Sequence, residues 1–177
     1  MSVILYRIRK AASGDHGELT ELSFASKRYW HYPDHYFTVW QPELTISGSY
    51  LEQNVVYVVE DKGIIVGYYA LVLLEKDLLL PGQRLDRGYW LDHMFILPEY
   101  IGKGLGRKLF AHLCSLCIKE GITRFELLAD PYAREFYEKM GCIYIKDVPS
   151  SIEGRTTPLL RMNLLSPEHS FFYCCPE

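Results

Sequence analysis

The fold is decided by one stretch of sequence, Ile96-Leu97-Pro98-Glu99-Tyr100-Ile101-Gly102-Lys103-Gly104-Leu105-Gly106-Arg107. Its three alternating glycines let several backbone N–H groups converge on one point without obstruction by side chains. Apolar residues at helical spacing then predict a helix from about residue 104 to 120. The N-terminus of such a helix favours an anion, and Lys103 and Arg107 add positive charge beside it. The stretch therefore predicts a turn that binds a pyrophosphate.

Two other nucleotide-binding loops fit this stretch poorly. The glycine spacing is G-x-G-x-G, whereas the dinucleotide fingerprint is G-x-G-x-x-G with an acidic ribose ligand further on. The P-loop pattern G-x-x-x-x-G-K-[ST] is absent.

Hydrophobic patterns on both sides of the loop predict alternating strands and helices. Strands are expected at residues 6–9, 55–60, 64–74, 89–97, 125–129, 142–146 and 159–164. Helices are expected at residues 15–28, 34–42, 104–120 and 131–141, the first opened by a capping box of Asp15 and Glu18. Residues 61–63 form the turn of a hairpin, and a loop precedes residue 89. This order predicts a mixed α/β fold.

Composition and charge indicate which binding partners and which cellular compartment to expect. A net charge of −3 and a pI near 6.1 give no basic field, so no nucleic-acid partner is expected. No apolar run approaches the roughly 20 residues that cross a bilayer, and residues 1–7 lack the layout of a signal peptide. We therefore expect a cytoplasmic protein with no membrane partner.

The five cysteines form no regular framework. Cys114 and Cys117 spell C-x-x-C, but they lie inside the apolar helical pattern and lack a second pair at metal-ligand spacing. They are predicted to be buried structural residues, and no metal is expected.

Two motifs resemble the signatures of the GNAT superfamily of N-acetyltransferases. In that family an apolar strand and a proline precede [RQ]-x-x-G-x-[GA], and residues 94–98 followed by 101–106 are similar to this pattern. Residues 130–142, Asp-Pro-Tyr-Ala-Arg-Glu-Phe-Tyr-Glu-Lys-Met-Gly-Cys, resemble the second motif, N-x-x-A-x-x-[LF]-Y-x-x-x-G-F. Three positions depart from the family: Ile101 replaces Arg or Gln, Asp130 replaces Asn, and Cys142 replaces Phe.

The resemblance covers roughly residues 4–165 and implies a mainly antiparallel, twisted sheet of about six to seven strands flanked by helices. It divides the chain into an acetyltransferase domain, residues 1–165, and a C-terminal tail, residues 166–177. It implies acetyl-CoA as cosubstrate, without metal, and transfer of the acetyl group to a primary amine by direct attack in a ternary complex. A non-catalytic acetyl-CoA sensor or interaction module is the alternative.

The resemblance also implies where the cofactor lies. The pantetheine arm is expected against backbone groups of Met94, Phe95 and Ile96, much as a strand edge captures a peptide. The pyrophosphate is expected on the amides of Gly102, Lys103, Gly104, Leu105, Gly106 and Arg107. Asp130 is expected to contact the cofactor arm, although it lacks the amide donor of Asn.

Proton transfer needs a donor and a base. Tyr137 occupies the proton-donor position of the second motif, and its competing interpretation is a core aromatic residue. Two-residue alternation places Asp92 on the same strand face as Met94, which makes Asp92 a candidate base. Glu126 and water are the alternatives, and His93 points to the opposite face and is predicted to be structural.

The aromatic stretch from Tyr29 to Trp40 falls on helices that line the acceptor site in this family. Trp30 and Tyr32 are predicted acceptor contacts, although a role in the core is the competing interpretation. The loop at residues 150–155 is a further candidate border of that site. We expect a small-molecule amine in preference to a peptide, and a homodimer is left open.

Overall fold

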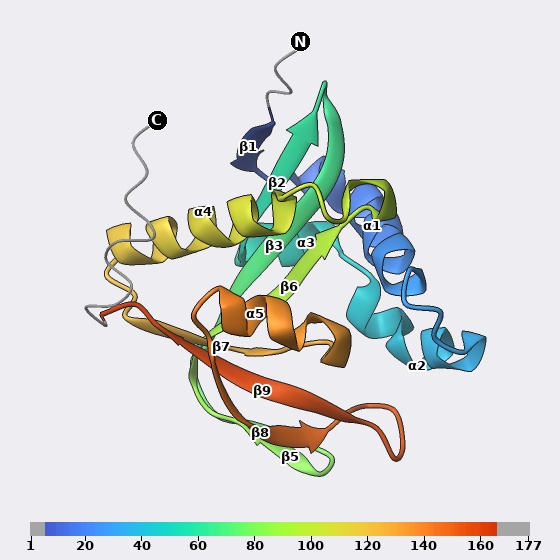
Figure 1. Cartoon of the computed structure of the whole chain (residues 1–177), viewed down its shortest axis with the longest axis vertical. Helices are drawn as coiled ribbons and strands as arrows, with labels where there is room; N and C mark the ends of the chain where they lie inside the picture. The colour runs from blue at the N-terminus through green and yellow to red at the C-terminus, as the bar shows by residue number, and fades with distance from the viewer. Residues whose placement is uncertain (1–5, 166–177) are drawn as a thin grey trace. The chain divides into compact units, whose positions relative to one another are not determined.

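The structure, a computed structural model, describes residues 6–165 (Figure 1). The predicted tail at residues 166–177 lies outside the described residues. The chain forms two compact units, the first from residues up to 71 and 93–109, the second from residues 72–92 and 110 onward. The chain passes from one unit to the other inside β3, β6 and α4, and each unit is described by itself.

The first unit contains most of the N-terminal elements. They are β1 (Arg7–Lys10), η1 (Ser13–Asp15), α1 (His16–Arg28), α2 (Asp34–Leu44), α3 (Gly48–Gln53), β2 (Val55–Asp61), most of β3 (Ile64–Leu74), the end of β6 (Gly88–Ile96), η2 (Pro98–Tyr100) and the start of α4 (Leu105–Lys119). Its core joins α1, through Leu19 and Leu22, to the buried faces of β2 and β3. Inside this core the hydroxyls of Ser23 and Tyr68 form a hydrogen bond of 2.6 Å, which satisfies both buried polar groups.

The second unit contains the remaining elements. They are β4 (Leu78–Leu80), β5 (Gln83–Leu85), β7 (Arg124–Leu128), η3 (Pro131–Ala133), α5 (Arg134–Lys139), β8 (Ile143–Pro149) and β9 (Thr156–Asn163). Aromatic rings pack α4 against β7 and α5, with Phe110 6.0 Å from Phe125 and 6.0 Å from Tyr137 between ring centroids. Cys114 and Cys117 on α4 are fully buried, as the apolar pattern predicts.

The strands form a seven-stranded sheet in the order β1-β2-β3-β6-β7-β9-β8, and β4 and β5 form a separate hairpin. Neighbouring strands are mostly antiparallel. The strands β6 and β7 run parallel, with Trp90 opposite Glu126. The predicted mixed α/β fold with six to seven strands is confirmed. Within residues 6–165 no helix combines the length and the apolar character that a membrane span requires.

Two local expectations differ from the structure. The first helix is confirmed, but its predicted capping box is wrong because the Asp15 carboxylate makes no cap hydrogen bond to α1. That carboxylate instead accepts hydrogen bonds from the Ala12 amide, at 2.8 Å, and from Arg9, at 2.7 Å, while Glu18 accepts one from the Ile65 amide, at 3.3 Å. Two nearby donors, Arg9 and the Ala12 amide at the start of η1, thus take the Asp15 carboxylate in place of the α1 amides. The loop expected before residue 89 also contains the β4–β5 hairpin, which turns at Gly82 with φ +77°.

Candidate active site

The glycine loop links the end of β6 to the start of α4, within the first unit. Gly102 and Gly104 both have φ +81°, a left-handed conformation that residues with a side chain rarely adopt. A Cβ atom at either position would meet no protein atom within 4 Å. The requirement for glycine therefore comes from the backbone conformation and not from crowding by the protein.

The backbone N–H groups of this loop differ in their availability. The Lys103 amide donates to the Tyr100 carbonyl at 3.3 Å, so this one amide of the predicted cradle already has a partner. The Lys108 amide makes the hydrogen bond to Gly104 that closes the first turn of α4, at 3.1 Å. The amides of Leu105, Gly106 and Arg107 precede that bond and have no intrahelical acceptor. They are the donors that fit a pyrophosphate.

Positive side chains surround these amides. Lys103 and Arg107 are exposed, and neither forms an ion pair with a carboxylate among residues 6–165. The Lys103 ammonium lies 4.7 Å from the centre of the Tyr100 ring, whose hydroxyl donates to Asp61 at 2.9 Å. The loop therefore keeps two exposed cations beside the free amides, as an anion site requires.

The C-terminal half of β6 carries the residues expected to bind the pantetheine arm. The rings of His93 and Phe95 both pack near Tyr68, at 6.1 and 6.0 Å between centroids, so they face the core of the first unit. Alternation puts Met94 on the other face. On the neighbouring strand, a Cβ atom at Gly67 would lie 2.7 Å from Ile96 Cδ1 and 3.1 Å from the Phe95 carbonyl oxygen. Gly67 thus permits the close approach of β3 to this segment.

The two candidate bases differ in how they are held. Asp92 is exposed and interacts with other residues. Glu126 is 8% exposed, and its Oε1 atom accepts two hydrogen bonds from Arg161, at 2.9 and 2.6 Å. Arg161 lies directly opposite Glu126 on β9. A carboxylate held by a guanidinium is poorly placed to collect a proton, so this contact counts against Glu126 as the base.

Tyr137 on α5 is 7% exposed and packs against Phe110 and Phe136. Burial, with smaller contributions from the nearby Cys142 and Asp130, raises the pKa of Tyr137 well above its ordinary value near 10. The phenol therefore stays protonated across the physiological range. It is suited to donate a hydrogen bond, and it resists giving up its proton completely.

Asp130 is engaged within the protein. Its Oδ1 atom accepts a hydrogen bond from the Tyr132 amide at 3.1 Å, which caps η3. Its Oδ2 atom lies 3.5 Å from Nη2 of Arg155, a residue of the loop between β8 and β9. The carboxylate thus fixes the start of the second motif to that loop.

The predicted acceptor contacts lie in an aromatic cluster of the first unit. Trp30 packs edge-on against Tyr29, with centroids 5.0 Å apart, and Tyr32 packs edge-on against Trp40, at 5.1 Å. The Lys27 ammonium lies 4.5 Å from the Trp40 ring centre and 5.4 Å from that of Tyr32. These distances lie within the range of cation–π attraction, so the cluster already binds one alkylammonium group.

The predicted site residues are therefore distributed over both units. The loop, residues 94–96 and the aromatic cluster belong to the first, and Asp92, Asp130 and Tyr137 belong to the second. Arg161 and Gly67 were not predicted from the sequence, whereas Arg155 lies in the loop that was expected to border the acceptor site. Alternation along residues 125–129 and 159–164 is the one signal that could have placed a charged side chain opposite Glu126.

Comparison with known proteins decides the family. Residues 17–142, well over half of the chain, match the sequence model of the acetyltransferase (GNAT) family. The chain belongs to the GNAT acetyltransferase family. None of the curated proteins matches the sequence significantly.

Solved structures of GNAT proteins share this fold. A GCN5-related N-acetyltransferase from Rhodopseudomonas palustris superposes with a TM-score of 0.71 at 18% identity, over 93% of this chain and 99% of that one. The PaiA N-acetyltransferase from Thermoplasma acidophilum, in complex with coenzyme A, gives 0.70 at 18% identity, over 92% and 99%. A GNAT acetyltransferase from Brucella melitensis, in complex with acetyl-CoA, gives 0.59 at 20% identity, over 92% and 90%.

Proposed function

We propose that this GNAT protein transfers the acetyl group of acetyl-CoA to the nitrogen of a primary amine by direct attack in a ternary complex. The observation that carries the proposal is the glycine loop. Its left-handed Gly102 and Gly104 precede α4, where the amides of residues 105–107 have no helical acceptor and Lys103 and Arg107 add positive charge. This donor set suits a pyrophosphate, and the backbone of Met94, Phe95 and Ile96 would bind the pantetheine arm.

The acceptor must lose a proton before it can attack. An alkylammonium with a pKa near 10.4 is only about 0.04% neutral at pH 7, which corresponds to a penalty of about 4.6 kcal/mol. Asp92, directly or through water, is our candidate for the group that accepts this proton. Its exposure suits exchange with solvent, whereas Arg161 already binds the Glu126 carboxylate.

The acetyl thioester supplies the activated carbonyl carbon, and its sulfur becomes the leaving group. In our proposal the Tyr137 hydroxyl donates a hydrogen bond to that sulfur as negative charge develops on it. Because burial raises the pKa of Tyr137, the hydroxyl holds its proton throughout this step. The final protonation of the thiolate is left to solvent or to the proton that the amine releases.

A covalent route through cysteine has little support. Cys142 is 6% exposed, and burial raises the pKa of its thiol. Burial also raises the pKa of Cys117 to about 12. Neither supplies the thiolate that a nucleophile needs near neutral pH.

The acceptor proposed here is a small molecule that carries an amine. The aromatic cluster around Tyr32 and Trp40 supports a cationic acceptor, because it already holds the ammonium of Lys27. Trp30 and Tyr32 are the proposed contacts.

Release of free coenzyme A thiol, measured with the full chain over a panel of small amines, polyamines and peptides, tests the proposal. We expect turnover with at least one small amine and intersecting double-reciprocal lines. Tight acetyl-CoA binding without turnover on any amine would replace the enzyme with a sensor, and parallel lines with a trapped acetyl-cysteine would overturn direct attack.

A further inference from the structure

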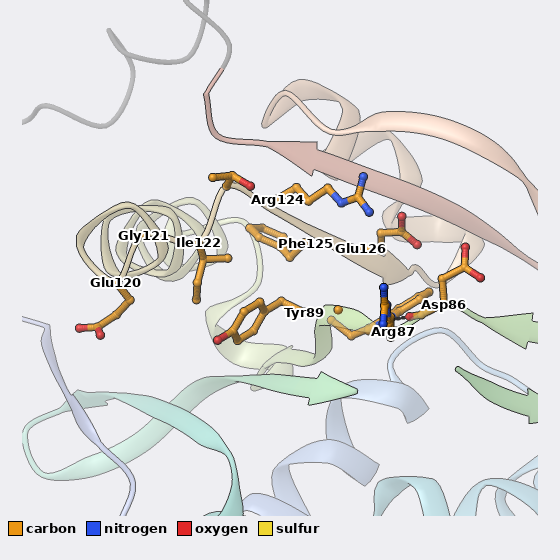
Figure 2. Close-up of a pocket in the computed structure, with 12 residues that line it drawn as sticks. Asp86, Arg87, Tyr89, Glu120, Gly121, Ile122, Arg124, Phe125 and Glu126 are labelled. Carbon is orange, nitrogen blue, oxygen red and sulfur yellow. Dashed lines mark hydrogen bonds between the residues drawn. The ribbon is translucent and has the colours of Figure 1, made fainter. Parts of the chain in front are cut away.

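A pocket of about 300 Å³ opens at the N-terminal ends of β6 and β7, within the second unit (Figure 2). Its lining comes from residues 86–90 and 120–126. This volume falls in the range of small-molecule sites in proteins. The glycine loop follows the other, C-terminal, end of β6, and neither that loop nor Tyr137 lines the pocket. The proposed acetyl-transfer reaction thus leaves this pocket unexplained.

One end of the pocket is apolar. Ile122 and the ring of Tyr89 lie at this end in Figure 2, next to Phe125, and the Glu120 side chain lies at its outer edge. Phe125 is fully buried, and the indole N–H of Trp90 donates to the Asp86 carbonyl at 2.9 Å. These walls are therefore held in place by packing and hydrogen bonding.

The other end gathers charged side chains, among them Arg87 and Arg124 (Figure 2). Neither guanidinium forms an ion pair or a hydrogen bond with any residue from 6 to 165. The carboxylates nearby have other partners. Arg84 binds both Asp77 and Asp86, the latter at 3.2 Å, and the Arg87 amide donates to Asp77 at 2.8 Å.

The remaining carboxylate at this end is Glu126, and Arg161 binds it at 2.6 Å. A second, more open hollow of about 510 Å³ shares Asp86, Arg87 and Arg124 with the pocket, and its lining adds two acidic and two basic residues, Glu75, Lys76, Asp77 and Arg84. Of the three charged residues common to both hollows, Asp86 is bound by Arg84, so the two without an ion pair among the described residues are Arg87 and Arg124. Guanidinium groups bind carboxylates and phosphates through paired hydrogen bonds.

We propose that this pocket binds a small organic anion, with its phosphate or carboxylate group on Arg87 and Arg124 and its apolar or aromatic body against Tyr89 and Ile122. The site is separate from the proposed acetyl-CoA site and stands on its own observations: a cavity, an apolar wall, and two guanidinium groups whose neighbouring carboxylates are already bound.

Calorimetry with the full chain tests the proposal, using phenyl phosphate, benzoate and inorganic phosphate as probes. Saturating coenzyme A is included so that the glycine loop cannot account for the binding. Phenyl phosphate is expected to bind more tightly than inorganic phosphate, because only the former reaches the apolar wall. Comparison with benzoate shows whether the pocket prefers a phosphate or a carboxylate.

Arg87→Ala and Arg124→Ala should each weaken the better probe at least about tenfold, the usual scale for a lost charge-assisted hydrogen-bond pair. The affinity of Arg87→Lys should lie between those of the wild type and Arg87→Ala, since lysine keeps the charge but loses the paired N–H donors of the guanidinium group. Lys146→Ala, which removes an exposed cation of the same unit away from the pocket, is the matched control and should change nothing. Circular dichroism checks that each variant folds.

Two results would overturn the proposal. One is the absence of binding of both phenyl phosphate and benzoate to the folded wild type. The other is binding that survives Arg87→Ala and Arg124→Ala unchanged. Each titration is repeated without coenzyme A. Failure of coenzyme A itself to bind would count against the proposed function, whereas binding of the probes in its absence would still support this pocket.

Discussion

Substitution of Gly104 by valine tests the glycine loop most directly. At φ +81° a residue with a side chain costs about 1–2 kcal/mol, and a β-branched residue lies at the upper end of that range. A free loop that relaxes to relieve this strain must adopt the left-handed conformation again on binding, so the strain reappears as a loss of affinity of up to about thirtyfold, at about 1.4 kcal/mol per tenfold. A Cβ atom at this position meets no protein atom, so crowding within the protein adds nothing. Any further loss would come from methyl groups that compete with the pyrophosphate for space.

Calorimetric titration of coenzyme A into Gly104→Val, Gly104→Ala and Ile101→Ala separates these effects. Gly104→Ala carries the backbone strain without the extra methyl groups. Ile101→Ala, in the same loop but at φ −63°, should change affinity by less than about twofold, because its backbone needs no glycine. Melting curves exclude unfolding as the cause. Equally small losses for Gly104→Val and Ile101→Ala would show that the pyrophosphate binds elsewhere.

Four further predictions concern Tyr137, Cys142 and Gly67. Tyr137→Phe should lower kcat about a hundredfold to a thousandfold, the scale for one lost hydrogen-bond donor to the transition state, with nearly unchanged acetyl-CoA affinity, and an unchanged kcat would leave Tyr137 as a packing residue. Burial raises the pKa of Tyr137 in the folded protein above its unfolded value near 10, so the neutral phenol contributes its full stability below pH 10. That stability is lost as pH rises from 10 through the folded pKa. The urea midpoint should therefore fall less between pH 9 and 11 in Tyr137→Phe than in the wild type. Cys142→Ala should keep its activity in the thiol-release assay, whereas loss of activity in a folded variant would revive a covalent route. Gly67→Ala should lower the free energy of unfolding by about 1–3 kcal/mol, measured in urea, because the new Cβ atom would lie 2.7 Å from Ile96 Cδ1. Adding Ile96→Val removes that carbon and should restore part of the loss, and no recovery would assign the strain to the Phe95 carbonyl oxygen and Val59 Cγ1, each 3.1 Å from the new Cβ atom.

The elements with strong periodicity could be predicted from the sequence, and the short ones could not. The helix after Gly104 and the hairpin around residues 61–63 lie where the apolar pattern places them. The helix α3 has only six residues, and its one local signal is the Ser47 hydroxyl that caps the Tyr50 amide. The β4–β5 hairpin consists of two three-residue strands, too short for alternation to mark.

The candidate site likewise contains residues whose role could be predicted from the sequence and residues whose role could not. The glycine loop could be placed because its function depends on the backbone, and glycine spacing reports backbone conformation directly. The base could not be chosen, because the availability of a carboxylate depends on its partners. Glu126 stayed an alternative to Asp92 in the sequence, because the Arg161 that binds its carboxylate lies 35 positions away in the chain. Long-range ion pairs of this kind leave little trace in one sequence.

The distribution of cysteines has a practical consequence. The three described thiols, Cys114, Cys117 and Cys142, are all buried, and all belong to the second unit. A thiol-labelling reagent reaches a buried cysteine only when the surrounding structure opens, so the labelling rate measures the free energy of that opening. The first unit contains no cysteine, so these rates report on the second unit alone. Compared with amide hydrogen exchange in the first unit, they reveal whether the two units unfold together or in separate steps.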